Sequence, residues 1–329
     1  MRIRPGMMLS LLAGALVLLA LAAAGSGAMQ LSPALLLASP LDSLSWQVWL
    51  HIRLPRVLLA LLVGMALALS GAAMQGVFRN PLADPGLLGV SSGAALGVAL
   101  AILFPVALPV LMALYLPLLA AFIGGLLVML LLFVLSVSGT RSLAQLLLVG
   151  IAINAVCTAF TGVLAWLSND QQLRQLSLWG MGSLGQAQWP TVIAVASLVV
   201  PVCAWLHRLA QPLNLLQLGE EEAHYLGVDV RRTRRRIVIL GALLVAAAVS
   251  VSGIIGFVGL VTPHLMRITL GVDHRWLLPG SALGGAFLLL LADTLARTLA
   301  APAEMPVGLL TSLVGGPWFL WLILRRRHG

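Results

Sequence analysis

Lysine is absent from this chain of 329 residues, and charged residues of any kind are scarce. All 19 basic residues are arginines, and only 9% of the sequence is charged. Soluble domains carry roughly 25% charged residues, so a soluble fold of this composition would lack a polar surface. The missing lysine also excludes the phosphate-binding loop G-x-x-x-x-G-K-[ST], whose lysine contacts the nucleotide phosphates. Any ATP-driven process therefore needs its nucleotide site on another chain.

Cysteine is nearly absent as well. Cys157 and Cys203 lie in separate apolar runs, without the C-x-x-C spacing of a redox or metal site. The sequence also lacks H-E-x-x-H and any other compact set of metal ligands. We expect both cysteines to be small core residues, and we expect this chain to bind no cofactor or metal.

Apolar residues make up 60% of the sequence, and the mean hydropathy is +1.06. Uncharged runs of about 20 residues, long enough to cross a bilayer as helices, recur along the chain. The sequence predicts an all-α integral membrane protein with a single transmembrane domain over residues 1–329. About ten spans are expected, near residues 8–28, 55–75, 91–108, 113–137, 143–167, 191–208, 235–255, 256–271, 277–297 and 305–324. The first is expected to be a retained span, because no convincing signal-peptide cleavage site follows it. The seventh and eighth have an alternative, one span followed by a broken helix.

Arginine placement predicts the orientation, because basic residues are retained in cytoplasmic loops. With both termini cytoplasmic, the arginines on that side are Arg2, Arg4, Arg79, Arg141, Arg208, the run from Arg231 to Arg236, Arg267, Arg275 and Arg325 to Arg327. Only Arg53, Arg56, Arg174 and Arg297 remain outside. The net charge of +9 is thereby explained by topology and needs no nucleic-acid partner.

Two glycine patterns suggest how the spans pack. Ser70-Gly71 precedes Pro81 by the same offset at which Ser252-Gly253 precedes Pro263, which suggests an inverted repeat, although chance similarity is an alternative. Small residues at G-x-x-x-G spacing let helix backbones approach closely in lipid. Gly89, Gly93 and Gly97 form two such steps, and Gly280 and Gly284 form another, so we expect close helix packing there.

A polar cytoplasmic segment separates the sixth and seventh spans. Residues 218–227 contain three consecutive glutamates in a short helical register that stops at Gly227. A solvated connector is one interpretation. Because the chain lacks a phosphate-binding loop and would need an ATPase partner, we favour a docking helix for a cytoplasmic partner. This helix would lie within a coupling segment at 212–230.

Several motifs resemble the FecCD family of binding-protein-dependent ABC permeases, which import haem, cobalamin and ferric siderophores. They are R-L-P-R at 53–56, L-V-G-M-A-L-A-L-S-G-A-A-M-Q at 62–75, R-N-P-L-A-D-P-G-L-L-G-V at 79–90, G-F-V-G-L-V-T-P-H at 256–264 and P-V-G at 306–308. The resemblance implies a homodimer of ten-span subunits in the bacterial inner membrane, with the pathway at the dimer interface. It further implies a separate cytoplasmic ATPase dimer that uses the ATP, and a periplasmic substrate-binding protein.

The resemblance also implies roles for individual residues. The coupling contact to the ATPase is expected at Gly219, Glu220, Glu221, Glu222, Ala223 and Gly227, which resemble an E-A-A-x-x-x-G pattern. A cytoplasmic gate is expected at Asn80 and Leu82. Its companion, polar in similar permeases, falls here on Leu143 and Ala144.

The external arginines are expected to dock the binding protein, because cationic patches orient an acidic partner. The resemblance places Arg53, Arg56 and Arg297 opposite glutamates of that protein. The alternatives are an intrahelical pair between Asp293 and Arg297 and, for Arg53 or Arg56, contact with lipid headgroups.

Near the predicted pathway mouth, Trp179 and Met181 suit a flat apolar ligand, and Arg174 suits a carboxylate such as a haem propionate. An interfacial tryptophan with a snorkelling arginine is the alternative. The sequence of residues 179–185, W-G-M-G-S-L-G, is more similar to haem permeases than to cobalamin permeases. We expect haem as cargo, with ferric siderophore and cobalamin as alternatives.

Two remaining residues separate further classes of function. His264 is expected to be a packing residue rather than an iron ligand. Asp293 is the only acid deep in a span, a position that also suits a proton relay, although Arg297 is a ready partner. A proton-coupled secondary transporter would need more such groups, and an intramembrane enzyme would need a nucleophile with its base or metal ligands.

Overall fold

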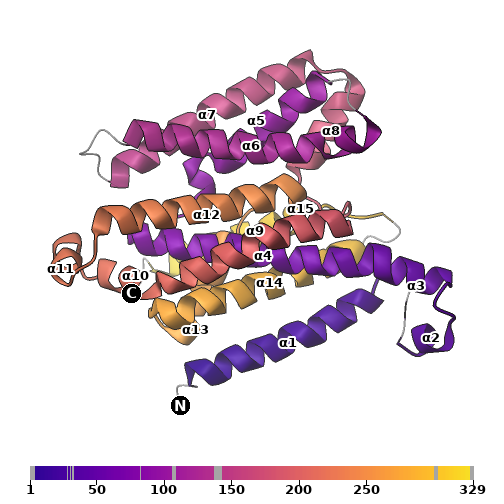
Figure 1. Cartoon of the computed structure of the whole chain (residues 1–329), viewed down its shortest axis with the longest axis horizontal. Helices are drawn as coiled ribbons and strands as arrows, with labels where there is room; N and C mark the ends of the chain where they lie inside the picture. Colours follow the sequence, from indigo (N-terminus) through magenta and orange to yellow (C-terminus); the bar gives the residue numbers. More distant parts are fainter. Residues whose placement is uncertain are drawn as a thin grey trace.

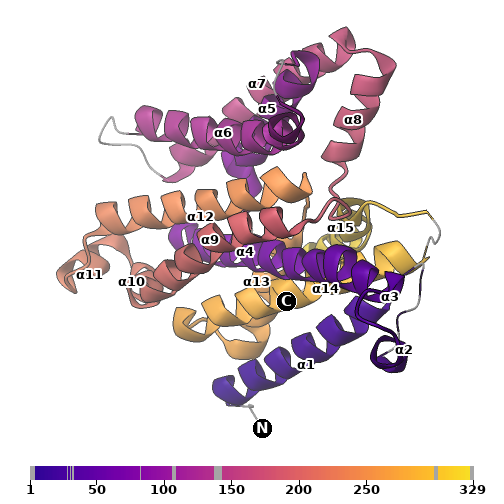
Figure 2. The same ribbon diagram turned by 45° about the vertical axis from the view of Figure 1, so that its right-hand side comes forward.

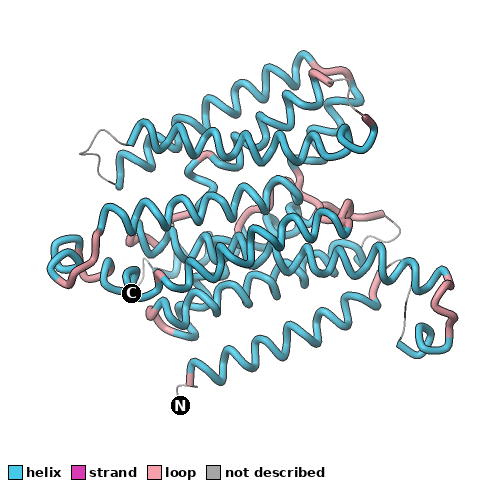
Figure 3. Tube along the Cα trace, viewed as in Figure 1, coloured by secondary structure: helices cyan, strands magenta, loops and turns pink. Residues whose placement is uncertain are grey.

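The computed structural model describes residues 4–27, 29, 31, 33–81, 83–105, 109–136, 143–299 and 303–326, and in this part of the chain all regular structure is helical (Figure 3). The helices are α1 (Pro5–Gly25), α2 (Pro33–Ala38), α3 (Leu44–Val48), η1 (Trp49–Arg53), α4 (Leu54–Phe78), η2 (Pro85–Leu88), α5 (Val90–Leu103), α6 (Val110–Ser136), α7 (Leu143–Leu167), α8 (Asp170–Gly180), α9 (Trp189–Arg208), α10 (Ala210–Leu216), α11 (Glu220–Tyr225), α12 (Val230–Ser252), α13 (Val258–Leu270), α14 (His274–Leu299) and α15 (Val307–Arg326).

Each of the ten predicted spans coincides with a helix. Seven helical stretches of the described chain are long and apolar enough to cross a membrane by themselves. The α5 and α15 helices are shorter apolar helices, and α13 has 13 residues. Helices α12 and α13 are separated by a non-helical linker over residues 253–257, and the short α13 fits both two spans and one span with a broken helix, so both stay predictions. The α5 helix ends at Leu103, five residues before the predicted limit of 108.

The second span is longer than the sequence predicted. Helix α3, the π-turn η1 and α4 run on without a break from Leu44 to Phe78, a stretch of 35 residues. A π-turn adds a residue to the helical turn and often marks a functional position. Here it contains Arg53, whose side chain points back toward the end of α1.

Helix α4 is the centre of the main layer, where it packs against α14, α12, α13 and α9 (Figure 1). Glycines allow these helices to approach with their backbones in contact. A Cβ atom at Gly64 would overlap the backbone of Gly285 in α14, and one at Gly71 would overlap the backbone of Gly259 in α13. Since lipid provides no hydrophobic driving force between helices, this close packing holds the bundle together.

A second layer consists of α5, α6 and α7, which lie together in both views (Figures 1 and 2). The predicted G-x-x-x-G packing is confirmed here, because Gly93 meets the backbone of Gly124 and Gly97 meets that of Ala120 in α6. The second pattern is confirmed as well. Gly280 and Gly284 leave room for side chains of α13.

Helix α8 links this layer to the main one (Figure 2). Asn169 begins it with a capping box, in which Asn169 Oδ1 accepts from the Gln172 N–H (2.9 Å) and Gln172 Oε1 accepts from the Asn169 N–H (3.1 Å). The amide of Gln172 also donates to the carbonyl of Ile102 in α5 (3.0 Å). These bonds fix the polar connector between the fifth and sixth spans as a helix.

The two copies of the expected inverted repeat differ in local structure. Ser70 and Gly71 lie inside α4, and not at the end of the second span as the sequence suggested. Ser252, in contrast, ends α12, and Gly253 has a positive φ of 68°. The physical reason is the contact with α13, which requires a helical glycine at 71, whereas Gly253 ends a helix. This motif therefore does not identify equivalent positions, and the repeat stays a prediction.

The close contact at Gly71 generates a test. Gly71→Ala is expected to lower the stability by about 1–3 kcal/mol, because the added methyl forces α4 and α13 apart. Gly14→Ala in α1 is the matched control, since a Cβ there meets nothing within 4 Å. It is expected to be neutral or to stabilise by about 0.5–1 kcal/mol. Thermal unfolding of the purified variants in detergent measures both, and equal midpoints would contradict the packing argument.

Candidate functional site

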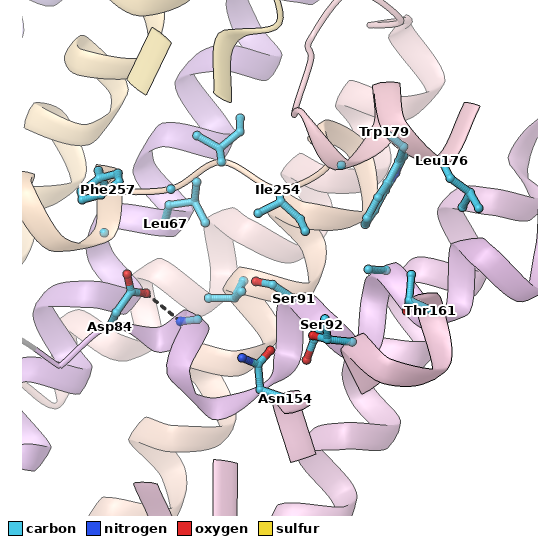
Figure 4. A pocket seen from close by; sticks show the side chains of 18 of the residues that line it. Leu67, Asp84, Ser91, Ser92, Asn154, Thr161, Leu176, Trp179, Ile254 and Phe257 are labelled. Carbon is cyan, nitrogen blue, oxygen red and sulfur yellow. Dashed lines mark hydrogen bonds between the residues drawn. The ribbon is translucent and has the colours of Figure 1, made fainter. Parts of the chain in front are cut away.

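A cavity of about 580 Å³ lies between the two layers of helices (Figure 4). Its walls come from α4, α5, α7, α8 and α12 and from the linker between α12 and α13. Leu176 and Trp179 of α8 form one side, and Ile254 and Phe257 of the linker form another. The walls are mainly apolar, with a few hydroxyl and amide groups, as in sites for small organic ligands.

The hydroxyl and amide side chains of the cavity come from two helices. Asn154, Thr158 and Thr161 are spaced four and three residues apart, so α7 presents them on one face. Ser91 and Ser92 of α5 complete the set (Figure 4). Sequence reasoning missed these five residues. The helical spacing on α7 was a usable signal, but it does not show which face of the helix meets a cavity.

The linker between α12 and α13 is held by backbone contacts. The Ser183 N–H donates to the carbonyl of Ser252 (2.7 Å), and the Gly308 N–H donates to that of Gly182 (3.2 Å). Side chains at Gly182 or Gly308 would overlap neighbouring carbonyl groups. These contacts join the loop after α8, the linker and the start of α15 into one junction beside the cavity.

Phe257 ends this linker with φ at 68°, a left-handed conformation that is unfavourable for an aromatic residue. Its side chain lies against Gly315 of α15, where a Cβ would occupy the same space. Gly315 therefore makes room for a strained residue. Strain of this kind is characteristic of functional sites.

Asp84 is the acid of the cavity wall, in the turn between α4 and η2. Its Oδ1 accepts a hydrogen bond from the Gly86 N–H (2.7 Å), and so Asp84 caps the short helix η2. Burial raises the pKa of Asp84 despite this hydrogen bond. The carboxyl group thus lies where protonation is favoured more than in water.

The end of the bundle at which α3 lies is here named the α3 end. There, a buried ion-pair cluster joins α4 to α14. Arg56 donates to both oxygens of Asp293 at 3.0–3.1 Å, and its Nη1 donates to Glu304 Oε2 (2.8 Å). Asp293 is fully buried, and Arg56 is 6% exposed. The predicted pair with Arg297 is present, but its N···O distance is 3.7 Å. Arg56 is therefore the principal partner of Asp293, which the sequence did not indicate.

The other two predicted docking arginines are also buried at this end. Arg297 donates to the carbonyl of Ala23 (2.6 Å) and Arg53 to that of Met29 (2.9 Å). Arg297 thus holds the last turn of α1, where cations favourably meet the carbonyl end of a helix, and Arg53 holds the chain after it. The structure thus places the three arginines near one another but gives each a partner within the chain, and their docking role stays a prediction. Glu304, which the sequence reasoning missed, is the half-exposed member of the cluster.

The predicted mouth residues separate in the structure. Trp179 lines the cavity, whereas Arg174 is exposed on α8 and does not line it. Met181 lies beyond the end of α8, and its carbonyl meets Gly308. Only Trp179 of this set therefore joins the cavity, and a role for the other two at the mouth stays a prediction.

The predicted coupling segment forms a protruding helix at the opposite end, here named the α11 end (Figure 1). Ala223 is fully buried against Leu216 and Val228, so it anchors α11 to α10 and to the turn before α12. Glu221 and Glu222 are exposed, and Glu220 pairs with Arg234. Gly219 and Gly227 have positive φ values of 145° and 87° and bound the helix. The segment is therefore a rigid surface feature.

The predicted gate residues are only partly described. Asn80 is exposed just after α4, and its N–H donates to the carbonyl of Gln75 (3.2 Å). Leu82 lies outside the described residues. Leu143 and Ala144 begin α7, and their side chains also lie outside the description.

His264 is buried inside α13, and its ring meets Trp318 edge to face at 6.1 Å. This contact agrees with a packing role. Across the described residues, no group of three or more histidine, cysteine, aspartate or glutamate side chains has the arrangement of a metal site.

Comparison with known proteins gives consistent similarities. The sequence matches the FecCD transport family over residues 10–325. It is 62% identical to the hemin transport system permease protein HmuU of Yersinia pestis over 327 residues, 99% of this chain and 98% of the relative. It is 41% identical to the vitamin B12 import system permease protein BtuC of Citrobacter koseri, over 85% of this chain and 84% of the relative. A metal-chelate type ABC transporter solved in an inward-facing conformation superposes with a TM-score of 0.88, at 37% identity, over 97% of this chain and 99% of that one.

The ion-pair cluster yields a stability prediction. Asp293→Asn is expected to cost about 3–5 kcal/mol, because it leaves the buried Arg56 and Arg297 without their counter-charge. Glu304→Gln removes the half-exposed partner and is expected to cost about 0–1 kcal/mol. Thermal unfolding in detergent compares the two. Similar small losses would show that Asp293 does not hold the cluster.

Proposed function

The chain belongs to the FecCD transport family, and on this premise we propose that it is the permease subunit of a binding-protein-dependent ABC importer that carries haem from the periplasm to the cytoplasm. The single observation that carries this proposal is the 62% identity to a hemin permease over nearly the full length of both chains. The cavity agrees with it, because its volume of about 580 Å³ lies in the range typical of organic ligands.

The mainly apolar lining of the cavity suits the flat apolar face of haem. Ser91, Asn154 and Thr158 can donate hydrogen bonds to its carboxylates, whereas the hydroxyls of Ser92 and Thr161 already donate to backbone carbonyls. Ferric siderophore and cobalamin are the alternative cargoes within the same family. The 41% identity to a vitamin B12 permease keeps cobalamin as the comparison in the experiment below.

A proton-coupled secondary transporter is the alternative of a different class. It would use a titratable group inside the bundle. Asp293 is the candidate, but it accepts three hydrogen bonds from Arg56. A carboxylate so tightly paired is a poor proton carrier, which favours an ATP-driven importer.

The proposed assembly contains two copies of this chain, a cytoplasmic ATPase dimer and a periplasmic binding protein, in the bacterial inner membrane. The exposed apolar face of α7, with Phe160 59% and Trp166 82% exposed, suits a partner copy or lipid. All ten expected spans cross the membrane in this proposal, including the shorter α5, α13 and α15. The absence of lysine leaves ATP hydrolysis to the partner.

Both termini face the cytoplasm in this arrangement, so the α11 end is cytoplasmic. The α11 helix then meets the ATPase through Glu221, Glu222 and the exposed Tyr225. Asn80 and Leu82, with Leu143 and Ala144, form the proposed gate on the same side. At the α3 end, a carboxylate of the binding protein reaches Arg56 by displacing Glu304, because Asp293 already occupies the rest of the guanidinium.

The cargo is tested in a reconstituted transporter with its ATPase and binding protein. Haem is expected to stimulate ATP turnover, whereas ferric siderophore and cobalamin are expected to leave it at the basal rate. ATP hydrolysis in proteoliposomes is the measurement. Stimulation by cobalamin or siderophore without stimulation by haem would reject haem but retain the importer.

Coupling is tested by charge reversal on α11. The double change Glu221→Lys and Glu222→Lys is expected to abolish uptake while the permease remains in the membrane, because both side chains are exposed and carry no part of the core. The exposed Arg232→Gln on α12 is the control and is expected to retain uptake. Uptake of haem into cells and copurification of the ATPase are measured together. Wild-type values of both for the double variant would reject coupling through α11.

A further inference from the structure

A second cavity, of about 310 Å³, lies at the α11 end, where α4, α10 and the link between α13 and α14 meet. It shares no lining residue with the first cavity. Gln75 separates the two, because its Nε2 lies 3.5 Å from the carbonyl oxygen of Gly259, which lines the first. No expected docking arginine lines this second cavity, but Gln217 belongs to the expected coupling segment at 212–230, and Arg79 and Pro81 flank the expected gate residue Asn80.

Its charge is positive. Arg79 and Arg267 line the cavity, and no acid is found among its described lining residues. Asp273 is adjacent in sequence to the lining residue His274, but its oxygens already accept from Arg275 (3.1 Å) and Asn214 (2.6 Å). Partial burial opposes ionisation, yet these hydrogen bonds lower the pKa of Asp273 to about 2. Asp273 is thus committed elsewhere, and the two arginines favour an anion.

Buried polar groups form the inner wall. His274 is 1% exposed, and its backbone N–H donates to Asn214 Oδ1 (2.8 Å). The ring Nδ1 lies 2.9 Å from the same oxygen and 2.8 Å from the amide Nε2 of Gln217, which fixes the position of the ring. Neither Nε2 of His274 nor Oε1 of Gln75, which is 2% exposed, has a hydrogen-bond partner among the described residues. Buried polar groups of this kind are ordinarily satisfied by a partner, and the oxygen of Gln75 calls for a donor.

One exposed apolar side chain lines the same site, and two more lie next to or near its lining residues in the sequence. Val272 lines the cavity and is 59% exposed, and Ile268 beside Arg267 is 67% exposed. Trp276, in the first turn of α14, is 39% exposed. Arginines, exposed aliphatic residues and a tryptophan together are typical of the boundary between lipid headgroups and acyl chains.

We propose that this cavity binds the headgroup of an anionic phospholipid, with phosphatidylglycerol as the matching chemistry. Arg79 and Arg267 hold the phosphate, and the buried Gln75 and His274 close the polar inner wall behind it. Val272 and Ile268 contact the start of an acyl chain. The proposal rests on the proposed orientation, which places the α11 end at the inner leaflet. Because Gln217 at the end of α10 also lines the cavity, the bound lipid braces α4 against the coupling segment.

Native mass spectrometry of the purified full-length chain tests this, with phosphatidylglycerol and zwitterionic phosphatidylethanolamine added at equal concentration. The wild type is expected to retain phosphatidylglycerol preferentially. Arg79→Gln and Arg267→Gln are each expected to weaken its binding about fivefold, and the double variant roughly 30-fold. Arg208→Gln is the matched control, because Arg208 is exposed at the same end but does not line the cavity. Its binding is expected to be unchanged.

Unchanged lipid binding in the double variant overturns the proposal, and an equal loss in Arg208→Gln shows general charge attraction instead. If the double variant does not fold, Val272→Glu takes its place, since this exposed position tolerates the change and the new acid repels the phosphate. Excess inorganic phosphate is expected not to displace the lipid. Displacement, with stabilisation by phosphate alone, would assign the cavity to free phosphate. The assay needs no ATPase or cargo, so its failure is distinguishable from failure of the proposed transport function.

Discussion

The rest of the structure depends on the close backbone contact between α4 and its neighbours. Gly64 against Gly285 and Gly71 against Gly259 bring three helices within direct backbone contact. This contact fixes the distance between α4, α13 and α14. It thereby positions the ion-pair cluster at the α3 end and the positively charged second cavity at the α11 end. The linker that carries Phe257 also takes its place from it, because Gly259 follows Phe257 by two residues.

Charge is arranged around this apolar centre rather than within it. The Arg56–Asp293 pair closes the α4–α14 contact at the α3 end, where Arg297 also holds the last turn of α1 and Arg53 holds the chain after it. At the α11 end, Asn214 and Gln217 hold His274 of α14 against the backbone of Gly76 in α4. Buried polar contacts thus join α14 to α4 at one end and to α10 at the other. Such contacts fix the axial register between helices that apolar packing alone would allow to slide past one another.

The sequence supported the helical class and the approximate position of every span, because long uncharged runs have one stable form in lipid. It also identified the packing glycines of α5 and α14, since their spacing is local. The partner of Asp293 was beyond its reach. Arg297 is four residues away and visible in the sequence, whereas Arg56 is 237 residues away and meets Asp293 only through the fold.

The residues of the cavity likewise divide into those that the sequence identified and those that only the fold reveals. Trp179 was identified from the sequence, but the five polar residues on α5 and α7 were not, because a helical face of small polar residues looks the same whether it meets a cavity or a neighbouring helix. The helix that contains Arg174 was not predicted, although Asn169 and Gln172 have the spacing of a capping box. That signal was local and available. Glu304 lies in an irregular segment, where periodicity carries no information.

The linker from Gly253 to Phe257 has a consequence for how the chain meets the bilayer. It crosses at the level of the middle of α4, where Leu67 shares the cavity wall with Ile254. Non-helical backbone leaves amide and carbonyl groups without helical partners, and hydrocarbon cannot solvate them. The linker must therefore contact protein or water, and not acyl chains, whenever the chain is in the membrane.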